Sequence, residues 1–405
     1  MYLTISKRFE FSASHRYYVP SWDEEANRTF FARRTGGPHG YGNNFTLFAV
    51  FHGDIDRDDG MVINVTTIKQ RVNEILADRY DHKFLNADSP PFNEIPPTPE
   101  NIAAVLMRDL TRAFDGERAT PVVCHVMESP ETGATAYADG MIERHYWLEF
   151  SAARKTMSPH LSDEGNRNLF GPAFGLHGHG YRLRVTLRGE VDGTYGLIRP
   201  PHDTDMYLGA IPKELDHRYL NDEVAGMKDR PMTTECLAQY IFEQLEPRLP
   251  VNRVRLHENS YFFAEYHAGR KSCLGVESRF HAAHRLHSPA LDDATNREVY
   301  GKCNNPAGHG HLYRLETTIG GELDERSGTL YPLDRAIGSI DDVLQRWDYK
   351  HLDEDTQDFT DRPSTAENMI VALWPRLQSA LDNRVVRARL WETPNNRFTL
   401  RADRS

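Results

Sequence analysis

The chain has few cysteines, no long apolar run and no excess of basic residues, and each absence disfavours a class of protein. Its four cysteines, Cys124, Cys236, Cys273 and Cys303, show no paired spacing, which argues against a disulfide framework or a Cys-x-x-Cys zinc site. No stretch approaches the roughly 20 apolar residues of a membrane-spanning helix, and the opening segment MYLTISKRFEF alternates and contains charged residues rather than forming an apolar run. The formal net charge of −11 disfavours a nucleic-acid-binding surface. We therefore expect a cytoplasmic protein that binds neither membrane nor nucleic acid.

What the sequence does contain is a threefold internal repeat. The segments FEFSASH, LEFSAAR and SRFHAAH are each followed by an Asn-Arg dipeptide and then by HGYGNNFTL, HGHGYRLRV or HGHLYRLET. Further blocks recur in the same order: YDHKFL, LDHRYL and WDYKHL, then TPENIA, TTECLA and TAENMI, then an alternating run that closes with glutamate. Such self-similarity predicts a tandem architecture. We place unit one at residues 1–140, unit two at 141–270 and unit three at 271–405.

Hydrophobic periodicity within a unit predicts strands at both ends and helix between them. Residues 182–191 and 253–266 alternate apolar and polar side chains, as half-buried strands do. Residues 233–245 carry apolar side chains at helical spacing, and their Thr-Thr-Glu opening suits a helix N-terminus. Two strands, a helical middle and two strands favour an α+β unit, with an antiparallel sheet covered on one face by helices.

Unit three resembles the 6-pyruvoyltetrahydropterin synthase family over nearly its whole length. The resemblance is carried by FHAAHRLHSP, VYGKCNNPAGHGHLY, STAEN and LWETPNN, and units one and two are similar to the same family with degraded motifs. It implies the tunnelling fold, in which each unit has a four-stranded antiparallel sheet and two helices. Three such units would close into a pseudo-trimeric β-barrel with helices outside. The resemblance also implies that two chains stack, so we expect a homodimer of pseudo-trimers.

Histidines of unit three predict a zinc site. His309 and His311 are two residues apart, so on a strand they point to the same face. The resemblance adds His284 as the third ligand, and three histidines with an open fourth position are typical of catalytic zinc. Unit two has Arg154 at the first ligand position, and unit one lacks both later histidines. We therefore expect one zinc per chain.

Cys303 and two Asp-His pairs are the candidate proton-transfer groups. The resemblance implies that this cysteine is the general base toward the substrate side chain, assisted by an Asp-His pair from another subunit. Unit three keeps Asp348 but has Tyr349 in place of the histidine. We expect unit one or unit two to supply the pair across an interface, although an Asp-His pair can also simply cap or pack. The intact pairs are Asp81 with His82 and Asp216 with His217.

The resemblance also implies which residues hold the substrate ring. One carboxylate can accept both adjacent N–H groups of a 2-amino-4-oxo pyrimidine, and Glu392 matches this anchor. Thr365 and Glu367 match the supporting pocket wall. Glu128 and Glu258 are the counterparts of Glu392 in units one and two. Two alternatives stay open for them: further pterin pockets, or a structural role at the ring interfaces.

Together these residues predict a zinc-dependent carbon-oxygen lyase. The expected substrate is 7,8-dihydroneopterin triphosphate, which loses triphosphate and becomes 6-pyruvoyltetrahydropterin. One alternative is 6-carboxytetrahydropterin synthase of the queuosine (deazapurine) pathway, which takes the same substrate, and the spacing from Cys303 to His309 favours the first. Another alternative is a zinc-containing pterin-binding protein without turnover, which Tyr349 and the degraded sites would favour.

Overall fold

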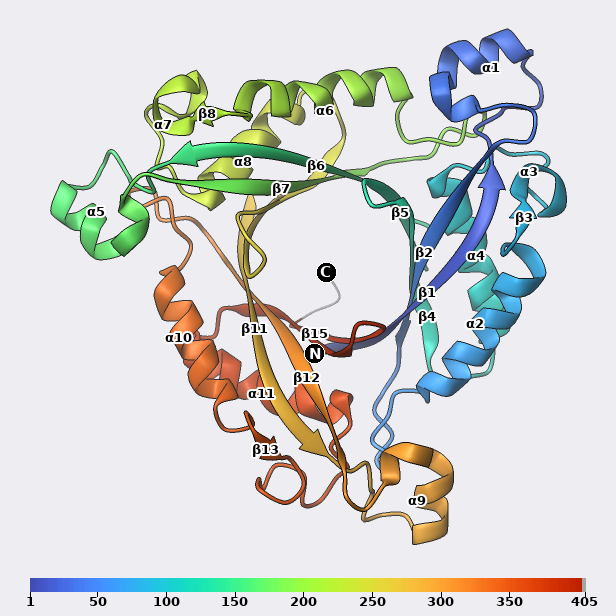
Figure 1. Ribbon diagram of the computed structural model, residues 1–405, viewed down its shortest axis with the longest axis vertical. Coiled ribbons are helices and arrows are strands. Elements are labelled where there is room, and N and C mark those ends of the chain that lie inside the picture. Colours follow the sequence, from blue (N-terminus) through green and yellow to red (C-terminus); the bar gives the residue numbers. More distant parts are fainter. Residues whose placement is uncertain (403–405) are drawn as a thin grey trace.

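The computed structural model describes residues 1–402 as an α+β fold in which twelve antiparallel strands close into a barrel (Figure 1). Each unit contributes four consecutive long strands. They are β1 (Tyr2–His15), β2 (Tyr41–His52), β4 (Thr120–Ser129), β5 (Thr132–Tyr137), β6 (Ile142–Arg154), β7 (His177–Arg188), β9 (Val251–His257), β10 (Phe262–His267), β11 (Lys271–His284), β12 (His309–Gly321), β14 (Val385–Thr393) and β15 (Asn396–Arg401). Three two-residue strands, β3 (Lys83–Phe84), β8 (Arg218–Tyr219) and β13 (Lys350–His351), pair in parallel with the first strand of their units.

The barrel closes because the last strand of each unit pairs with the first strand of the next. The three junctions are β5 with β6, β10 with β11, and β15 with β1. The predicted pseudo-trimeric barrel is therefore confirmed. The alternating run at residues 253–266 forms a hairpin rather than one strand, because β9 ends at His257 and β10 begins at Phe262.

Helices cover the outside of the barrel (Figure 1). Each unit has two long ones: α2 (Val65–Arg79) and α4 (Pro99–Ala113), α6 (Pro201–Leu215) and α8 (Thr234–Leu245), α10 (Leu333–Leu344) and α11 (Ala366–Ala380). A short helix and a 3-10 turn join the first two strands of each unit: α1 (Glu24–Phe31) with η1 (Ala32–Thr35), α5 (Asp163–Phe170) with η2 (Gly171–Phe174), and α9 (Asp293–Tyr300) with η4 (Gly301–Asn304). The remaining short helices are α3 (Leu85–Asp88), α7 (Leu220–Glu223) and η3 (Ala225–Met227). Between residues 1 and 402, no helix is long and apolar enough to cross a membrane.

The hydrophobic core lies between the barrel wall and the helices. Strand residues alternate sides, so on β7 the side chains of Leu183 and Val185 are fully buried under the helices, while Arg182 and Arg184 face the barrel interior. Fully burying such an aliphatic side chain contributes roughly 1.5–3 kcal/mol. On α8, Thr233 is the predicted N-cap, and its side chain accepts a hydrogen bond from the backbone N–H of Cys236.

Candidate metal centre and catalytic site

Strand register brings the three predicted metal ligands together. On the paired strands β11 and β12, His284 lies opposite His309, and His311 follows two residues along on the same face. The ring centroids of His309 and His311 lie 4.6 and 5.4 Å from that of His284. One ligand atom from each ring lies within 4.8 Å of the other two. We call these three residues the histidine triad.

The hydrogen bonding of the triad suits a metal ion. Nδ1 of His284 donates to the carbonyl oxygen of Ser364 at 3.0 Å, so Nε2 carries a lone pair, which the Tyr313 hydroxyl approaches to 3.4 Å and which could instead bind a metal ion. Within the described residues, Nδ1 of His309 and Nε2 of His311 are buried without a hydrogen-bond partner. Burial lowers the pKa of His284 to about 3 and that of His311 to about 4, so both rings are neutral at pH 7, as metal ligation requires. The donor set fits a divalent ion that prefers imidazole, such as zinc.

Cys303 and Glu392 lie beside the triad. Cys303 sits on η4, and its carbonyl oxygen accepts a hydrogen bond from the backbone N–H of Leu286 at 2.9 Å, which fastens the loop to the segment that follows β11. Oε1 of Glu392, near the end of β14, lies 3.9 Å from Nε2 of His284. Burial raises the pKa of the Cys303 thiol, and the nearby Glu392 raises it further, while Lys302 lowers it. Thiol, carboxylate and imidazoles therefore share one site in unit three.

The predicted pocket-wall residues also join neighbouring units. Oγ1 of Thr365 donates to the carbonyl oxygen of Gly60 at 2.7 Å, and the backbone N–H of Val62 donates to Glu367 at 3.2 Å. Gly60 has a left-handed backbone conformation with a φ of +66°, and a Cβ there would lie 2.5 Å from the Pro363 side chain. Residues of unit one thus form part of the wall of the site in unit three. The equivalent contacts elsewhere are Thr98 with Gly196, Glu100 with Ile198, Thr233 with Gly328, and Glu235 with Leu330.

Protonation of the buried Glu367 side chain makes the free energy of unfolding depend on pH. Burial raises its pKa from 4.5 to about 8, so the folded protein holds a proton that the unfolded chain releases. Its contribution to stability is therefore complete below pH 4.5 and is lost as pH rises through 8. Because each pKa unit corresponds to about 1.4 kcal/mol, we expect the stability of the wild type, relative to Glu367→Gln, to fall by a few kcal/mol between pH 5 and pH 9. Denaturant unfolding at several pH values measures this difference.

Glu235, the matched residue of unit two, serves as the control. Burial raises its pKa to about 7, so Glu235→Gln should remove a smaller part of the pH dependence. Parallel pH profiles for the wild type and Glu367→Gln would contradict the prediction.

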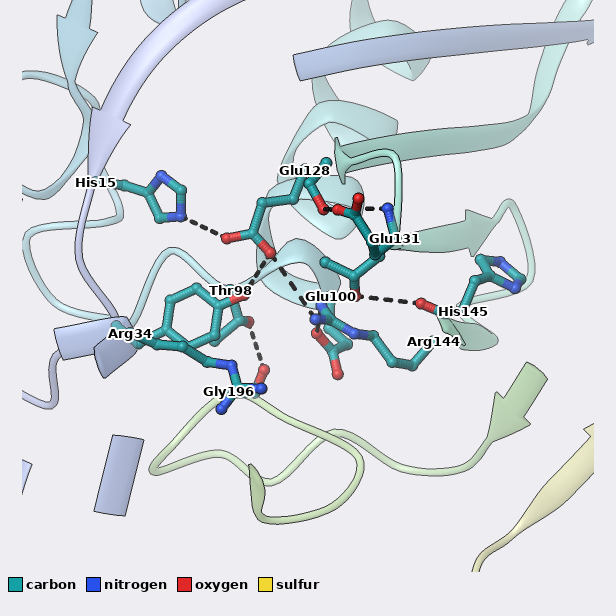
Figure 2. A network of polar contacts seen from close by, with 12 residues as sticks. His15, Arg34, Thr98, Glu100, Glu128, Glu131, Arg144, His145 and Gly196 are labelled. Carbon is teal, nitrogen blue, oxygen red and sulfur yellow. Dashed lines mark hydrogen bonds and ion pairs between the residues drawn. The ribbon is translucent and has the colours of Figure 1, made fainter. Parts of the chain in front are cut away.

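In unit one the equivalent place is filled by internal polar contacts, which Figure 2 shows around Glu128. One carboxylate oxygen of Glu128 lies 2.9 Å from Nε2 of His15, and the other accepts a hydrogen bond from the hydroxyl of Tyr17 at 2.7 Å. Arg144 of unit two lies 3.9 Å away. Burial alone would raise the pKa of Glu128, but His15 and Arg144 bring it below its ordinary value. A cavity of about 580 Å³ lies beside these residues, and Tyr41 helps to line it.

In unit two an arginine stands where unit three has its first histidine. Arg154 forms an ion pair with Glu258, and Nε2 of His179 lies 3.0 Å from the other carboxylate oxygen. Burial alone would raise the pKa of Glu258, but Arg154 and His179 lower it to about 2. Both oxygens of Glu258 are therefore engaged. Of the three matching glutamates Glu128, Glu258 and Glu392, Glu392 is the one that forms no ion pair with an arginine within residues 1–402.

The Asp-His pairs are exposed and bound to their own units. Oδ1 of Asp81 accepts the backbone N–H of Ser12 at 2.9 Å, and the backbone N–H of His82 donates to the carbonyl oxygen of Ser12 at 2.6 Å. Nδ1 of His82 lies 2.9 Å from Asp81, and Nδ1 of His217 lies 2.8 Å from Asp216. Both imidazole side chains are 83% exposed. Among the described residues, the hydrogen bonds and ion pairs of both Asp-His pairs stay within their own units.

Neither pair reaches Cys303 within the same chain. Unit one contacts unit three at the start of α2, where the Asn64 side chain donates to the carbonyl oxygen of Val299. His82 lies beyond the other end of α2, whose 15 residues span about 22 Å. Unit two is no nearer, because in Figure 1 β8, next to His217, lies across the ring from α9, which precedes Cys303. The structure thus gathers the triad, Cys303 and Glu392, but leaves both pairs apart from them.

Unit three has two further histidines to which sequence reasoning gave no role. His281 stacks on Tyr349 with ring centroids 4.9 Å apart, and its Nδ1 lies 3.7 Å from Asp348. His351 packs against Gly308, where a Cβ would lie 2.6 Å from its Nε2. The signal was present in the repeat, because units one and two have serine in place of His281 and an aromatic residue in place of His351.

Comparison with known proteins agrees with the repeat. The family model described as 6-pyruvoyl tetrahydropterin synthase matches residues 4–139, 145–269 and 273–403. The chain is 43% identical over 125 residues to 6-pyruvoyl tetrahydrobiopterin synthase of Drosophila melanogaster, which covers 30% of this chain and 74% of that protein. The human protein of the same name is 39% identical over 133 residues, covering 32% of this chain and 92% of that one.

A solved structure matches to the same extent. Caenorhabditis elegans 6-pyruvoyl tetrahydropterin synthase is 37% identical in sequence, with 33% of this chain and 96% of that chain covered and a TM-score of 0.32. The two curated relatives, matched over 125 and 133 residues, therefore each correspond to about one of the three units. The chain belongs to the 6-pyruvoyl tetrahydropterin synthase family, whose model it matches three times in tandem.

Proposed function

We propose that the chain is a zinc-dependent lyase that converts 7,8-dihydroneopterin triphosphate into 6-pyruvoyltetrahydropterin and triphosphate. The observation that carries this proposal is the convergence of the histidine triad, Cys303 and Glu392 in unit three. The names of the relatives support the same activity. Because the other units lack the triad, the proposal assigns one catalytic site to each chain.

Each residue of the site has a role in the proposed reaction. The histidine triad would hold zinc, which when bound supplies a Lewis acid that makes the C–H bonds of the substrate side chain more acidic. Cys303 removes a proton from a side-chain carbon and returns it to the neighbouring carbon. Glu392 accepts the two N–H groups of the pyrimidine ring, while Thr365 and Glu367 hold the wall formed with unit one.

We further propose that two chains stack as a homodimer, so that an Asp-His pair of one chain meets Cys303 of the other. The exposure of His82 and His217 supports this arrangement. Both pairs lie at the barrel end that carries the triad. Ser12 binds Asp81 and Ser151 binds Asp216, and each serine is three residues from the counterpart of His284 in its unit, His15 or Arg154. A partner chain at this end would supply the proton relay that unit three lacks.

Single substitutions test which pair serves Cys303. In a symmetric dimer only one kind of pair faces the thiol, so His82→Ala and His217→Ala should have unequal effects, with one lowering turnover about a hundredfold. The decisive measurement mixes the impaired variant with Cys303→Ala. Mixed dimers contain one complete site, so activity should return to roughly a quarter of the wild-type value. Full activity in both histidine variants, or no recovery on mixing, would sink the shared-site proposal.

Chromatographic identification of the product tests the activity itself. The zinc-loaded protein is incubated with 7,8-dihydroneopterin triphosphate, and we expect triphosphate and 6-pyruvoyltetrahydropterin. Appearance of 6-carboxytetrahydropterin would instead identify the second synthase. Tight pterin binding without triphosphate release would identify a binding protein, the candidate that Tyr349 favours because it replaces the histidine of the third pair.

A further inference from the structure

The interior of the barrel concentrates arginine side chains, although the whole chain has a net charge of −11. Alternate residues of each strand face inward, and on β7, β9, β14 and β15 many of these positions are arginines. The buried carboxylates of the interior are fewer. The arginines are Arg184, Arg253, Arg255, Arg387, Arg389 and Arg397, and the carboxylates are Glu143, Glu265 and Glu316.

Three of these guanidinium groups share two carboxylates. Arg255 bonds to Glu265 and lies 3.4 Å from Glu316. Arg387 contacts the same two carboxylates at 3.3 to 3.4 Å, and Arg389 donates to Glu316 at 2.9 Å. Arg255 and Arg387 are only 5% and 7% exposed. These two acids therefore already form ion pairs with three arginines.

The other three arginines form no ion pair with a carboxylate within the described residues. Burial alone would lower the pKa of Arg253, but the nearby Glu265 and Glu143 raise it. Arg184 lies over the ring of Trp147 at 5.3 Å, and Arg397 lies 5.7 Å from the ring of Phe48. The Nε atoms of Arg184, Arg253 and Arg397 are buried without a hydrogen-bond partner. The side chains are nevertheless partly exposed, so a small ion inside the barrel can reach them. Buried cations without counter-charge are unfavourable.

The positively charged side chains come from strands in different parts of the barrel wall. Burial, followed by Arg253 and Arg255, lowers the pKa of Arg184 well below its ordinary value. On β4 of unit one, burial followed by Arg184 and Arg397 lowers the pKa of His125 to about 3. Side chains from β4, β7 and β15 therefore act on one another across a common interior space.

We propose that the barrel interior binds a multiply charged oxyanion of the phosphate class, such as inorganic triphosphate, between the arginines of β7, β9 and β15. With Arg188, which forms an ion pair with Glu143, seven guanidinium groups face three carboxylates, so a trivalent or more highly charged anion offsets most of the excess. The planar guanidinium group matches phosphate oxygens with paired N–H donors, and it keeps its charge at any physiological pH. This site is separate from the proposed catalytic site and does not depend on the lyase activity.

Calorimetric titration of the metal-free, full-length protein with inorganic triphosphate tests the proposal. We expect one tightly bound ion per chain and a higher melting temperature in triphosphate than in sodium chloride of equal ionic strength. The double variant Arg253→Gln with Arg397→Gln should bind at least about tenfold more weakly. Without the anion, Arg397→Gln alone should melt no lower than the wild type, because it removes a largely desolvated cation that forms no ion pair with a carboxylate within residues 1–402.

Two controls separate this site from others. Arg28→Gln changes an arginine on α1 whose side chain is 73% exposed, and it should leave the affinity unchanged. His309→Ala with His311→Ala should also bind normally, which distinguishes the interior from the catalytic site. Arg184→Gln provides an independent interior variant that should weaken binding. Wild-type affinity in the interior variants, or no binding by the wild type, would overturn the proposal.

Discussion

Replacing Cys303 with alanine should lower the rate of triphosphate release at least about a hundredfold, the usual contribution of a positioned proton-transfer group. The thiol shares its site with Glu392 and the triad, and no other cysteine lies in that loop. Because Cys303 is not one of the triad ligands, the variant should keep the metal content of the wild type. The measurements are steady-state triphosphate release and metal content of the same preparations.

Cys273 is the matched control for this experiment. It is also a partly exposed free thiol, but it lies on β11 near the barrel interior, and burial raises its pKa to about 11. Cys273→Ala should therefore retain nearly full turnover. If Cys303→Ala keeps more than about a tenth of wild-type activity, proton transfer does not depend on the thiol and its assignment is wrong.

Replacing His309 with alanine should abolish metal binding, whereas the matched change His179→Ala in unit two should not alter the metal content. Two remaining imidazoles bind zinc far more weakly than three, and catalytic zinc sites use three protein ligands. In unit two, Arg154 holds Glu258 and places a fixed positive charge beside the two histidines, which disfavours a cation there. Elemental analysis after dialysis should find about one zinc per chain in the wild type and in His179→Ala, and close to none in His309→Ala.

Thermal unfolding gives a second readout of the same prediction. Zinc should raise the melting temperature of the wild type and of His179→Ala but not that of His309→Ala, because a ligand stabilises only the state that binds it. Two zinc ions per wild-type chain, or retention of zinc by His309→Ala, would contradict a single site in unit three.

The threefold repeat predicted more of the fold than any other feature of the sequence. Blocks recurring in one order predict three similar units, and the spacing of His309 and His311 predicts two side chains on one strand face. That His284 faces His309 depends on the register of β11 with β12, which strand periodicity alone does not determine. The family resemblance supplied this residue before the structure did.

Contacts between units lay beyond what the sequence could predict. Nothing in the alternation of polar and apolar residues indicates that Thr365 bonds to Gly60, or that His82 is at the far end of α2 from the site of unit three. Both facts depend on how whole units pack around the ring. The occupation of Glu128 by His15 and Tyr17 likewise required three-dimensional neighbours from separate segments.

The seam between β15 and β1 has a consequence for how the three units can diverge. It is formed by six residue pairs, from Tyr2 with Arg401 to Lys7 with Asn396. In a ring of separate identical subunits, one substitution appears at all three interfaces and all three sites. In this chain the three units belong to one polypeptide, which keeps them at high effective concentration and determines which units become neighbours in the ring. A mutation therefore changes one site only, so Arg154 can replace a metal ligand in unit two while unit three keeps its full triad.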